Sequence, residues 1–290
     1  MRVPEGWGWR AAFAVLCVLA SSRWILADQW QAMGSTLRSE AWACGLAAFV
    51  AAVVALSERR RLPRAWIVVE LLAIGVGLLA APELGAVLHG AASGALDRTI
   101  ALCFVPVIVM VADGIWSESG AAMSLWPGLA GLGGALLVFP VALPSSVLDW
   151  VGLVVPPIAV SAACVACRRV ARGLDAVWCA ALLLAGGAVC LSLMAAASGG
   201  VAAESFSVWA VVLDLVLVMA VVFVVLRVDA LRYASRYFFV PLLSIAEGLI
   251  LLRSGVTLRQ GFGLALLTAG GVALVRGRGT DGGTSGLRLR

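Results

Sequence analysis

Residues 94–106 read Gly-Ala-Leu-Asp-Arg-Thr-Ile-Ala-Leu-Cys-Phe-Val-Pro, and residues 229–241 read Asp-Ala-Leu-Arg-Tyr-Ala-Ser-Arg-Tyr-Phe-Phe-Val-Pro. With their prolines aligned, the two stretches share Ala-Leu and Phe-Val-Pro at an offset of 135 residues. Downstream, the Gly-Gly pair at 133–134 matches the pair at 270–271 at an offset of 137 residues. Both offsets are close to half of the 290-residue chain, so the sequence predicts an internal duplication.

The chain is 62% hydrophobic and 13% charged, with a mean hydropathy of +1.05. Because a membrane-crossing helix needs roughly 17 to 25 mostly apolar residues, we expect an all-α polytopic membrane protein. The predicted spans are residues 11–27, 41–56, 65–81, 99–115, 122–142, 147–166, 177–196, 207–226, 237–252 and 260–275. The ten spans leave no room for a separate soluble domain.

The duplication divides the spans into two groups of five, residues 1–142 and residues 143–275. Five is an odd number, so the second repeat enters the membrane upside down relative to the first. Inverted repeats of this kind give many secondary transporters two related conformations, one open to each side of the membrane. Residues 276–290 are Gly-rich without apolar periodicity, which predicts a disordered cytoplasmic tail.

All 21 basic residues are Arg, and their distribution predicts the orientation of the chain. Sixteen fall before span one, in the connections after spans two, six and eight, or after span ten, whereas four fall on the opposite side. Since cytoplasmic loops carry the excess of positive charge, both termini are predicted to be cytoplasmic, in a bacterial inner membrane. The net charge of +5 then reflects topology, and no nucleic-acid partner is implied.

The chain resembles the drug/metabolite transporter superfamily, in particular its ten-span EamA-type members. In that family each half has a Pro early in its fourth span, an apolar run ending in Gly-Glu, a short link with Thr and Gln, and a Gly-rich fifth span. The matching residues are Pro106, Ser117-Glu118, Gly128, Gly131, Gly133 and Gly134 in the first half, and Pro241, Glu247-Gly248, Thr257, Gln260, Gly263 and Gly270-Gly271 in the second. The usual Glu of the second half is replaced by Ser254, after Arg253. The resemblance implies metabolite transport and leaves the substrate undefined.

Proline and glycine positions predict bends and close packing. Pro106 and Pro241 each remove a backbone hydrogen bond and should bend their helices around a central cavity. Pro156 and Pro157 predict a sharper break in span six, and spans one, three, four, six, eight and nine are expected to line the cavity. The glycines of spans five and ten should allow close helix contact, either within the bundle or in a homodimer.

Five charged residues fall inside predicted spans: Arg23, Glu70, Asp113, Asp214 and Glu247. A charge at mid-bilayer costs roughly 2.5 to 3.5 kcal/mol on insertion scales, so such residues usually have a partner or face a cavity. We expect Asp214 and Glu247 to bind a cationic or zwitterionic substrate or protons, with Arg23 as their counter-charge, and Glu70 and Asp113 to form the equivalent inner pair. Structural ion pairing is the alternative.

We therefore expect a secondary transporter, an exporter or permease of a small metabolite. The alternatives are a non-transporting assembly or permease subunit and, less favoured, a membrane-embedded lipid-modifying enzyme. The sequence predicts no enzymatic activity and no cofactor: there is no Walker-type phosphate loop, and the Cys164-x-x-Cys167 motif has neither a second pair nor a nearby His. No metal site is predicted.

Overall fold

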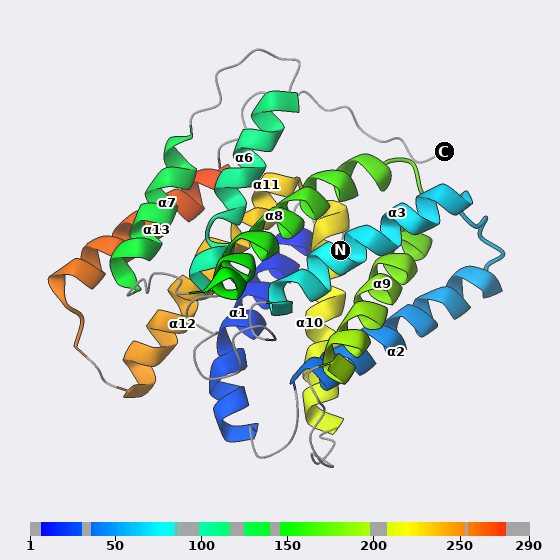
Figure 1. The fold of residues 1–290 in the computed structure, drawn as a ribbon, viewed down its shortest axis with the longest axis horizontal. Helices are drawn as coiled ribbons and strands as arrows, with labels where there is room; N and C mark the ends of the chain where they lie inside the picture. The colour runs from blue at the N-terminus through cyan, green and yellow to red at the C-terminus, as the bar shows by residue number, and fades with distance from the viewer. Residues whose placement is uncertain are drawn as a thin grey trace.

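The computed structural model describes residues 7–30, 36–84, 87, 99–116, 125–139, 146–197, 208–252 and 255–276, with the backbone alone at 7, 24–30, 36, 116 and 252. The predicted tail beyond residue 276, Glu118 and Ser254 lie outside these ranges. Every regular element in the described residues is a helix (Figure 1). The elements are α1 (Trp7–Trp30), α2 (Thr36–Ser57), α3 (Ala65–Gly75), η2 (Val76–Ala80), η3 (Ala81–Glu83), α6 (Val105–Trp116), α7 (Trp126–Val138), α8 (Val147–Val170), α9 (Ala176–Ala197), α10 (Val208–Arg227), α11 (Ala230–Ala234), α12 (Arg236–Leu252) and α13 (Leu258–Arg276).

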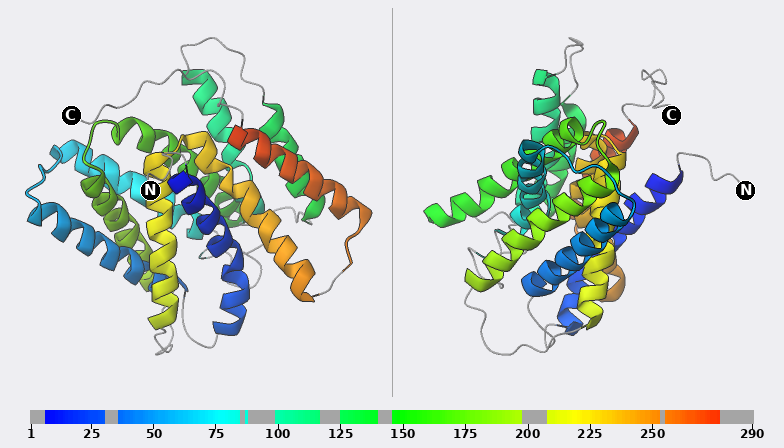
Figure 2. Two further views of the ribbon diagram at one scale, coloured as in Figure 1. Left: turned by 180° about the vertical axis from the view of Figure 1, so that it is seen from behind. Right: turned by 90° about the vertical axis from the view of Figure 1, so that its right-hand side faces the viewer.

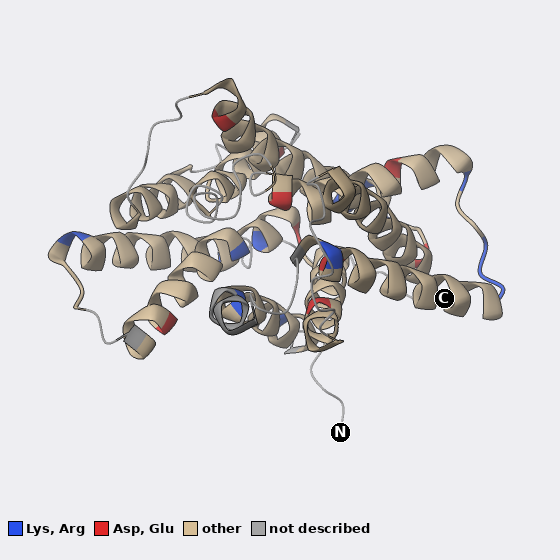
Figure 3. Ribbon diagram, turned by 60° about the horizontal axis from the view of Figure 1, so that its bottom comes forward, with Lys and Arg blue, Asp and Glu red and all other residues tan. Residues whose placement is uncertain are grey.

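Seven helices of the described chain are long and apolar enough to cross a membrane. They cover Leu37–Ser57, Ala65–Glu83, Val147–Val170, Ala176–Ala197, Val208–Arg227, Ala230–Leu251 and Leu258–Arg276. Two shorter apolar helices cover Thr99–Ile115 and Trp126–Val138. Charged positions are sparse along the helices (Figure 3). The prediction of an all-helical, polytopic integral membrane protein is confirmed, and each of the ten expected spans overlaps a helix.

Two helices begin with reciprocal capping interactions that the sequence encodes locally. At α8, Ser146 Oγ accepts from the Asp149 N–H at 3.1 Å while the Asp149 carboxylate accepts from the Ser146 N–H at 2.8 Å. At α13, Thr257 Oγ1 accepts from the Gln260 N–H at 3.3 Å and Gln260 Oε1 accepts from the Thr257 N–H at 3.0 Å. Each pair satisfies two of the amide groups that a helix start leaves free. Thr257, directly before α13, and Gln260, in its first turn, therefore have a structural role.

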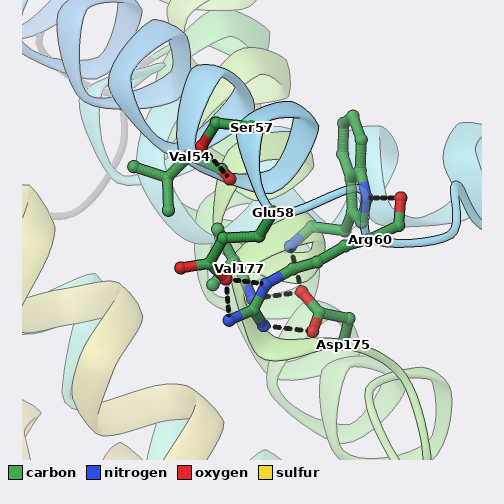
Figure 4. A network of polar contacts seen from close by, with 7 residues as sticks. Val54, Ser57, Glu58, Arg60, Asp175 and Val177 are labelled. Carbon is green, nitrogen blue, oxygen red and sulfur yellow. Dashed lines mark hydrogen bonds and ion pairs between the residues drawn. The ribbon is translucent and has the colours of Figure 1, made fainter.

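A polar network joins the α2–α3 connection to the start of α9 (Figure 4). The Arg60 guanidinium forms ion pairs with both Glu58 and Asp175. Asp175 Oδ1 accepts from the N–H groups of Val177 and Trp178 at 3.0 and 3.1 Å, which caps α9. Burial opposes ionisation of Asp175, but these N–H groups and Arg60 outweigh it and lower the pKa of the carboxyl below its ordinary value. The network fixes the ends of α2 and α9 to one another.

Small residues allow two helix pairs to pack backbone against backbone: α2 with α9, and α7 with α13 (Figures 1 and 2). In the second pair, a Cβ atom on Gly134 would lie 2.5 Å from the Leu267 nitrogen, and one on Gly270 would lie 2.6 Å from the Gly131 nitrogen. These glycines are therefore used for packing within one chain, and they offer no free surface to a second copy.

The same device brings α3 against α9. A methyl group on Gly75 would overlap the Leu183 carbonyl, and one on Gly186 would overlap the Leu72 carbonyl. The contact is reciprocal, since the glycine of each helix lies against a backbone carbonyl of the other helix. Any side chain at either position would push the two backbones apart.

The predicted break at Pro156 and Pro157 and the predicted bend at Pro106 are not what the structure shows. α8 continues as α-helix from Val147 to Val170 through Pro156 and Pro157, so the expected break in helical structure is absent from this described helix. Pro106 is the second residue of α6, after turn residues 103–104. A proline in the first turn removes an N–H that would have no partner in its own helix, so Pro106 starts α6.

Pro241 lies inside α12 and frees the carbonyl of Tyr237, four residues earlier. That carbonyl oxygen accepts from Cys103 Sγ at 3.3 Å. Cys103 comes from the turn before α6, so the backbone group released by Pro241 is satisfied by a neighbouring segment. This exchange is what an apolar surrounding requires of an irregular helix.

The helix that begins at Ala65 changes its winding before it ends. α3 passes at Gly75 into a π-helix, Val76–Ala80, and then into a 3-10 turn, Ala81–Glu83. The predicted plain span over 65–81 did not include this change. π-helical turns alter the direction of the side chains that follow them and are frequent at functional sites. Here the irregular segment contributes residues to the central cavity described next.

Candidate substrate cavity

A cavity of about 170 Å³ lies among the helices. At roughly 10–15 Å³ for each water, it has room for about a dozen water molecules or a small metabolite. Its lining residues come from α1 (Leu16, Ala20, Arg23), α2 (Glu40, Cys44), the η2–η3 segment (Leu78, Leu79, Pro82, Glu83), residues 99–102 (Thr99, Leu102), α9 (Leu191), α10 (Leu217, Val218, Val221) and α12 (Arg236, Tyr237, Val240, Pro241). The predicted contribution of span six is missing from this lining, whereas α2 and α9 contribute instead.

Three carboxylates surround Arg23, and two of them, Glu40 and Glu83, line the cavity with it. The Arg23 guanidinium forms an ion pair with Glu40, and lies 3.6 Å from an Asp214 oxygen and 3.9 Å from a Glu83 oxygen. Ser39 Oγ donates to Asp214 Oδ2 at 2.6 Å. We call Arg23, Glu40, Glu83 and Asp214 the acidic cluster, because its carboxylates outnumber its single cation.

Helix packing explains why this cluster forms. α1 and α2 both pack against α10, so Arg23 and Glu40 approach Asp214 from two sides. All three carboxylates are buried, and only 4% of the Asp214 surface is exposed. Burying charges away from water costs several kcal/mol per ion unless each is paired. Arg23 therefore has three acidic neighbours, of which Glu40 is the nearest.

The structure brings Arg23 and Asp214 together, but it places Glu247, on α12, against two serines of α1 instead. Glu247 Oε1 accepts from Ser21 Oγ at 2.7 Å and from Ser22 Oγ at 3.0 Å. Its second oxygen, Oε2, is buried without a hydrogen-bond partner in the described residues. Glu247 therefore lies beside the acidic cluster's helix but forms no ion pair within the described part of the chain.

Of the five predicted charged site residues, Arg23 lines the cavity and the four acidic residues do not. Glu70 on α3 and Asp113 on α6 are half-buried and are not lining residues. Among the predicted helix bends, Pro241 lines the cavity, while Pro106 and the pair at 156–157 do not.

Three charged lining residues could not be recognised from the sequence. Glu40 and Glu83 fall just outside the predicted spans 41–56 and 65–81, and Arg236 was assigned to the cytoplasmic connection before span nine. In the structure Arg236 is the first residue of α12, has only 8% of its surface exposed and lines the cavity. Its Nη2 donates to the Tyr237 hydroxyl at 2.6 Å. The sequence feature that could have identified these three residues is that each lies at the end of an apolar run.

The cysteines give no indication of metal or redox chemistry in the described residues. All seven are unbonded, and six of them are buried in the bundle. No group of three or more His, Cys, Asp or Glu residues in the described ranges has the geometry to hold a metal ion. The arrangement instead offers charged groups for binding a small molecule in an otherwise apolar cavity.

Comparison with known proteins supports the fold. No family model and no curated protein matches the sequence. Fourteen chains of solved structures do match. One of these, described as "Crystal structure of protein", aligns with a TM-score of 0.68 and 19% sequence identity over 92% of this chain and 96% of that chain. At this identity the likeness establishes a shared fold over nearly the whole length of both chains.

Proposed function

We propose that this protein is a secondary transporter, an exporter or permease that moves a small metabolite across the membrane by alternating access. The observation that carries the proposal is the central cavity, which is lined by both halves of the chain and holds buried charges of both signs. Buried charges in a membrane protein usually face a binding site or an ion path. A cavity of this volume suits a small metabolite, and no enzymatic activity or cofactor is part of the proposal.

We further propose that the chain consists of two inverted repeats of five spans, residues 1–142 and 143–275, with both termini in the cytoplasm of a bacterial cell. Under this assignment α1, α2, α3, α6 and α7 correspond to α8, α9, α10, α12 and α13. The packing supports it, because α2–α9 and α7–α13 each join equivalent helices.

Several of the other helix contacts come in pairs that the same assignment exchanges. The α3–α9 contact corresponds to α10–α2, and the α1–α10 contact corresponds to α8–α3. Likewise α1–α12 corresponds to α8–α6, and α12–α13 corresponds to α6–α7. A bundle without internal symmetry has no reason to reproduce its contacts in this way, so the pattern favours a duplicated architecture.

The test of transport uses purified protein in two steps. Amino acids, nucleosides, sugars and organic cations are first compared by the rise that each causes in the thermal unfolding temperature, since a ligand that binds the native state stabilises it. The compounds that bind are then offered in labelled form to proteoliposomes. We expect uptake above that of protein-free liposomes for at least one of them. Binding without uptake of any bound compound would contradict transport.

A further inference from the structure

A second pocket lies where α1 begins and α13 ends, with α11 beside them (Figure 2). The start of α1 is held against α12, because the Phe13 ring packs edge-on against the Phe239 ring with centroids 6.0 Å apart. A single residue, Ser235, separates α11 from α12, and α11 also packs against α13. These contacts bring the first turns of α1 together with α11 and the last turn of α13.

Three arginines and no acidic residue line this pocket. Its lining residues are Trp9, Arg10 and Phe13 from α1, Arg232 from α11, and Val275 and Arg276 from α13. The pocket has a volume of about 510 Å³, within the roughly 300 to 1,000 Å³ that is usual for ligand sites. It is therefore a positively charged space of the size of a ligand site.

The described part of the protein supplies these arginines with no counter-ion. No carboxylate oxygen of the described residues lies within 4.0 Å of Arg10, Arg232 or Arg276. Asp229, directly before α11, pairs instead with Arg168 of α8 at 2.9 Å. Arg232 Nε is buried without a hydrogen-bond partner in the same residues. A buried donor of this kind calls for an acceptor, and a bound anion would supply one.

The Trp9 ring orients two of the three arginines. The guanidinium carbons of Arg10 and Arg232 lie 5.6 and 5.7 Å from its centroid. A cation–π contact positions a guanidinium but does not neutralise its charge. Two guanidinium groups are therefore held beside one ring, and Arg276 adds a third cation to the same pocket. Guanidinium groups recognise phosphate through paired N–H···O hydrogen bonds.

The position of the pocket favours a lipid over a soluble anion. Arg276 is the last residue of one membrane-crossing helix, and Arg232 lies in the first turn of another. The ends of such helices lie at the depth of the phospholipid headgroups. Phe13 and Val275 add apolar surface to the pocket, which the glycerol and upper acyl chain of a lipid can cover. Basic pockets between membrane helices are sites at which anionic headgroups bind.

The aligned first half of the sequence carries no copy of these charges. At the repeat offsets of 135 and 137 residues, the positions of Arg232 and Arg276 are occupied by Asp97 and Phe139. The fold of the repeat unit therefore does not require arginine at either position. In the proposed topology all three arginines lie on the cytoplasmic side, where anionic lipids give the membrane its negative surface potential.

We propose that Arg10, Arg232 and Arg276 form a binding site for the headgroup of an anionic phospholipid. The lipid phosphate accepts hydrogen bonds from the guanidinium groups, and the lipid links α1 to α11 and α13. The site shares no lining residue with the central cavity. It is independent of the proposed transport function, so a failure of uptake would leave it unaffected.

The test counts the lipids bound to the purified full-length protein by native mass spectrometry, with phosphatidylglycerol and phosphatidylcholine of identical acyl chains. We expect phosphatidylglycerol to bind at least about tenfold more tightly than phosphatidylcholine. Arg232→Gln and Arg276→Gln should each lower the affinity for phosphatidylglycerol roughly fivefold and leave that for phosphatidylcholine unchanged. The matched control is Arg61→Gln, which removes an exposed arginine of the α2–α3 connection outside the pocket. It should alter neither affinity.

Equal affinity for the two lipids, or an unchanged preference in both Arg232→Gln and Arg276→Gln, would overturn the site. Glycerol 3-phosphate offers the anionic group without the acyl chains and should bind more weakly than phosphatidylglycerol. If it binds equally well through the same arginines, the lipid assignment is wrong and the pocket takes a soluble anion. Arg276 is exposed at the end of α13, so Arg276→Gln decides the matter should Arg232→Gln fail to fold.

Discussion

Replacement of Asp214 by Asn is expected to lower the rate of substrate uptake into proteoliposomes at least about tenfold, equivalent to roughly 1.4 kcal/mol in binding or barrier. The change removes one charge from the acidic cluster with little change of shape. Arg23 keeps Glu40 and Glu83 as partners, so the variant leaves no unpaired cation and should fold normally. Glu247→Gln is expected to lower uptake in the same way, because Glu247 lies on α12, next to the cluster's helix α1.

Glu58→Gln provides the matched control. Glu58 is an exposed carboxylate beside Arg60, far from the cavity lining, and its replacement should leave uptake unchanged. The double variant Arg23→Gln, Asp214→Asn removes one charge of each sign and should recover part of the lost rate. Wild-type uptake in both Asp214→Asn and Glu247→Gln would contradict a role in transport and leave these residues with a structural role in packing against α1 and α2.

Gly134→Ala is expected to destabilise the protein by about 1–3 kcal/mol, because the added methyl group meets backbone atoms of α13 and neither helix can move without loss of packing. The new Cβ atom would lie 2.5 Å from the Leu267 nitrogen and 2.6 Å from the Gly263 oxygen. The measurement is the unfolding temperature of the purified protein in detergent. Gly186→Ala should behave similarly at the α3–α9 contact.

The adjacent residue gives the control. Gly133 lies on the same helix with no atom within 4 Å of a Cβ position. Gly133→Ala should therefore maintain or raise stability, by up to about 1 kcal/mol, through better helix propensity. Equal stability of the two variants would mean that α7 and α13 pack less closely than the structure indicates.

The all-helical membrane class followed from hydropathy alone, because spans of about twenty apolar residues have few alternatives to a membrane helix. The helix positions were predicted to within a few residues for the same reason. The effect of the prolines was predicted less well. Pro156 and Pro157 lie within a continuous helix, and Pro106 lies in the first turn of one. The effect of a proline depends on its distance from the helix start and on contacts with other helices, and a local sequence pattern contains neither.

The candidate site was predicted only in part, because local sequence does not show which helix ends are covered by other helices. Arg23 and Asp214 were singled out because each interrupts an apolar run, and the structure places them in one ion-paired cluster. Glu40, Glu83 and Arg236 lie at the ends of their spans, where a charge is ordinarily solvated. Only the packing of α1, α2, α10 and α12 reveals that these ends are covered by other helices.

The central claim, two repeats of opposite orientation around one cavity, is tested most directly by the topology of the connections. Reporter fusions after Arg64, Arg172 and Arg278 are predicted to report the cytoplasm, and fusions at residues 89 and 204 the outside. This pattern follows from the 16 Arg on one side against four on the other. Finding residues 89 and 172 on the same side of the membrane would contradict the inverted repeat and remove the main support for alternating access.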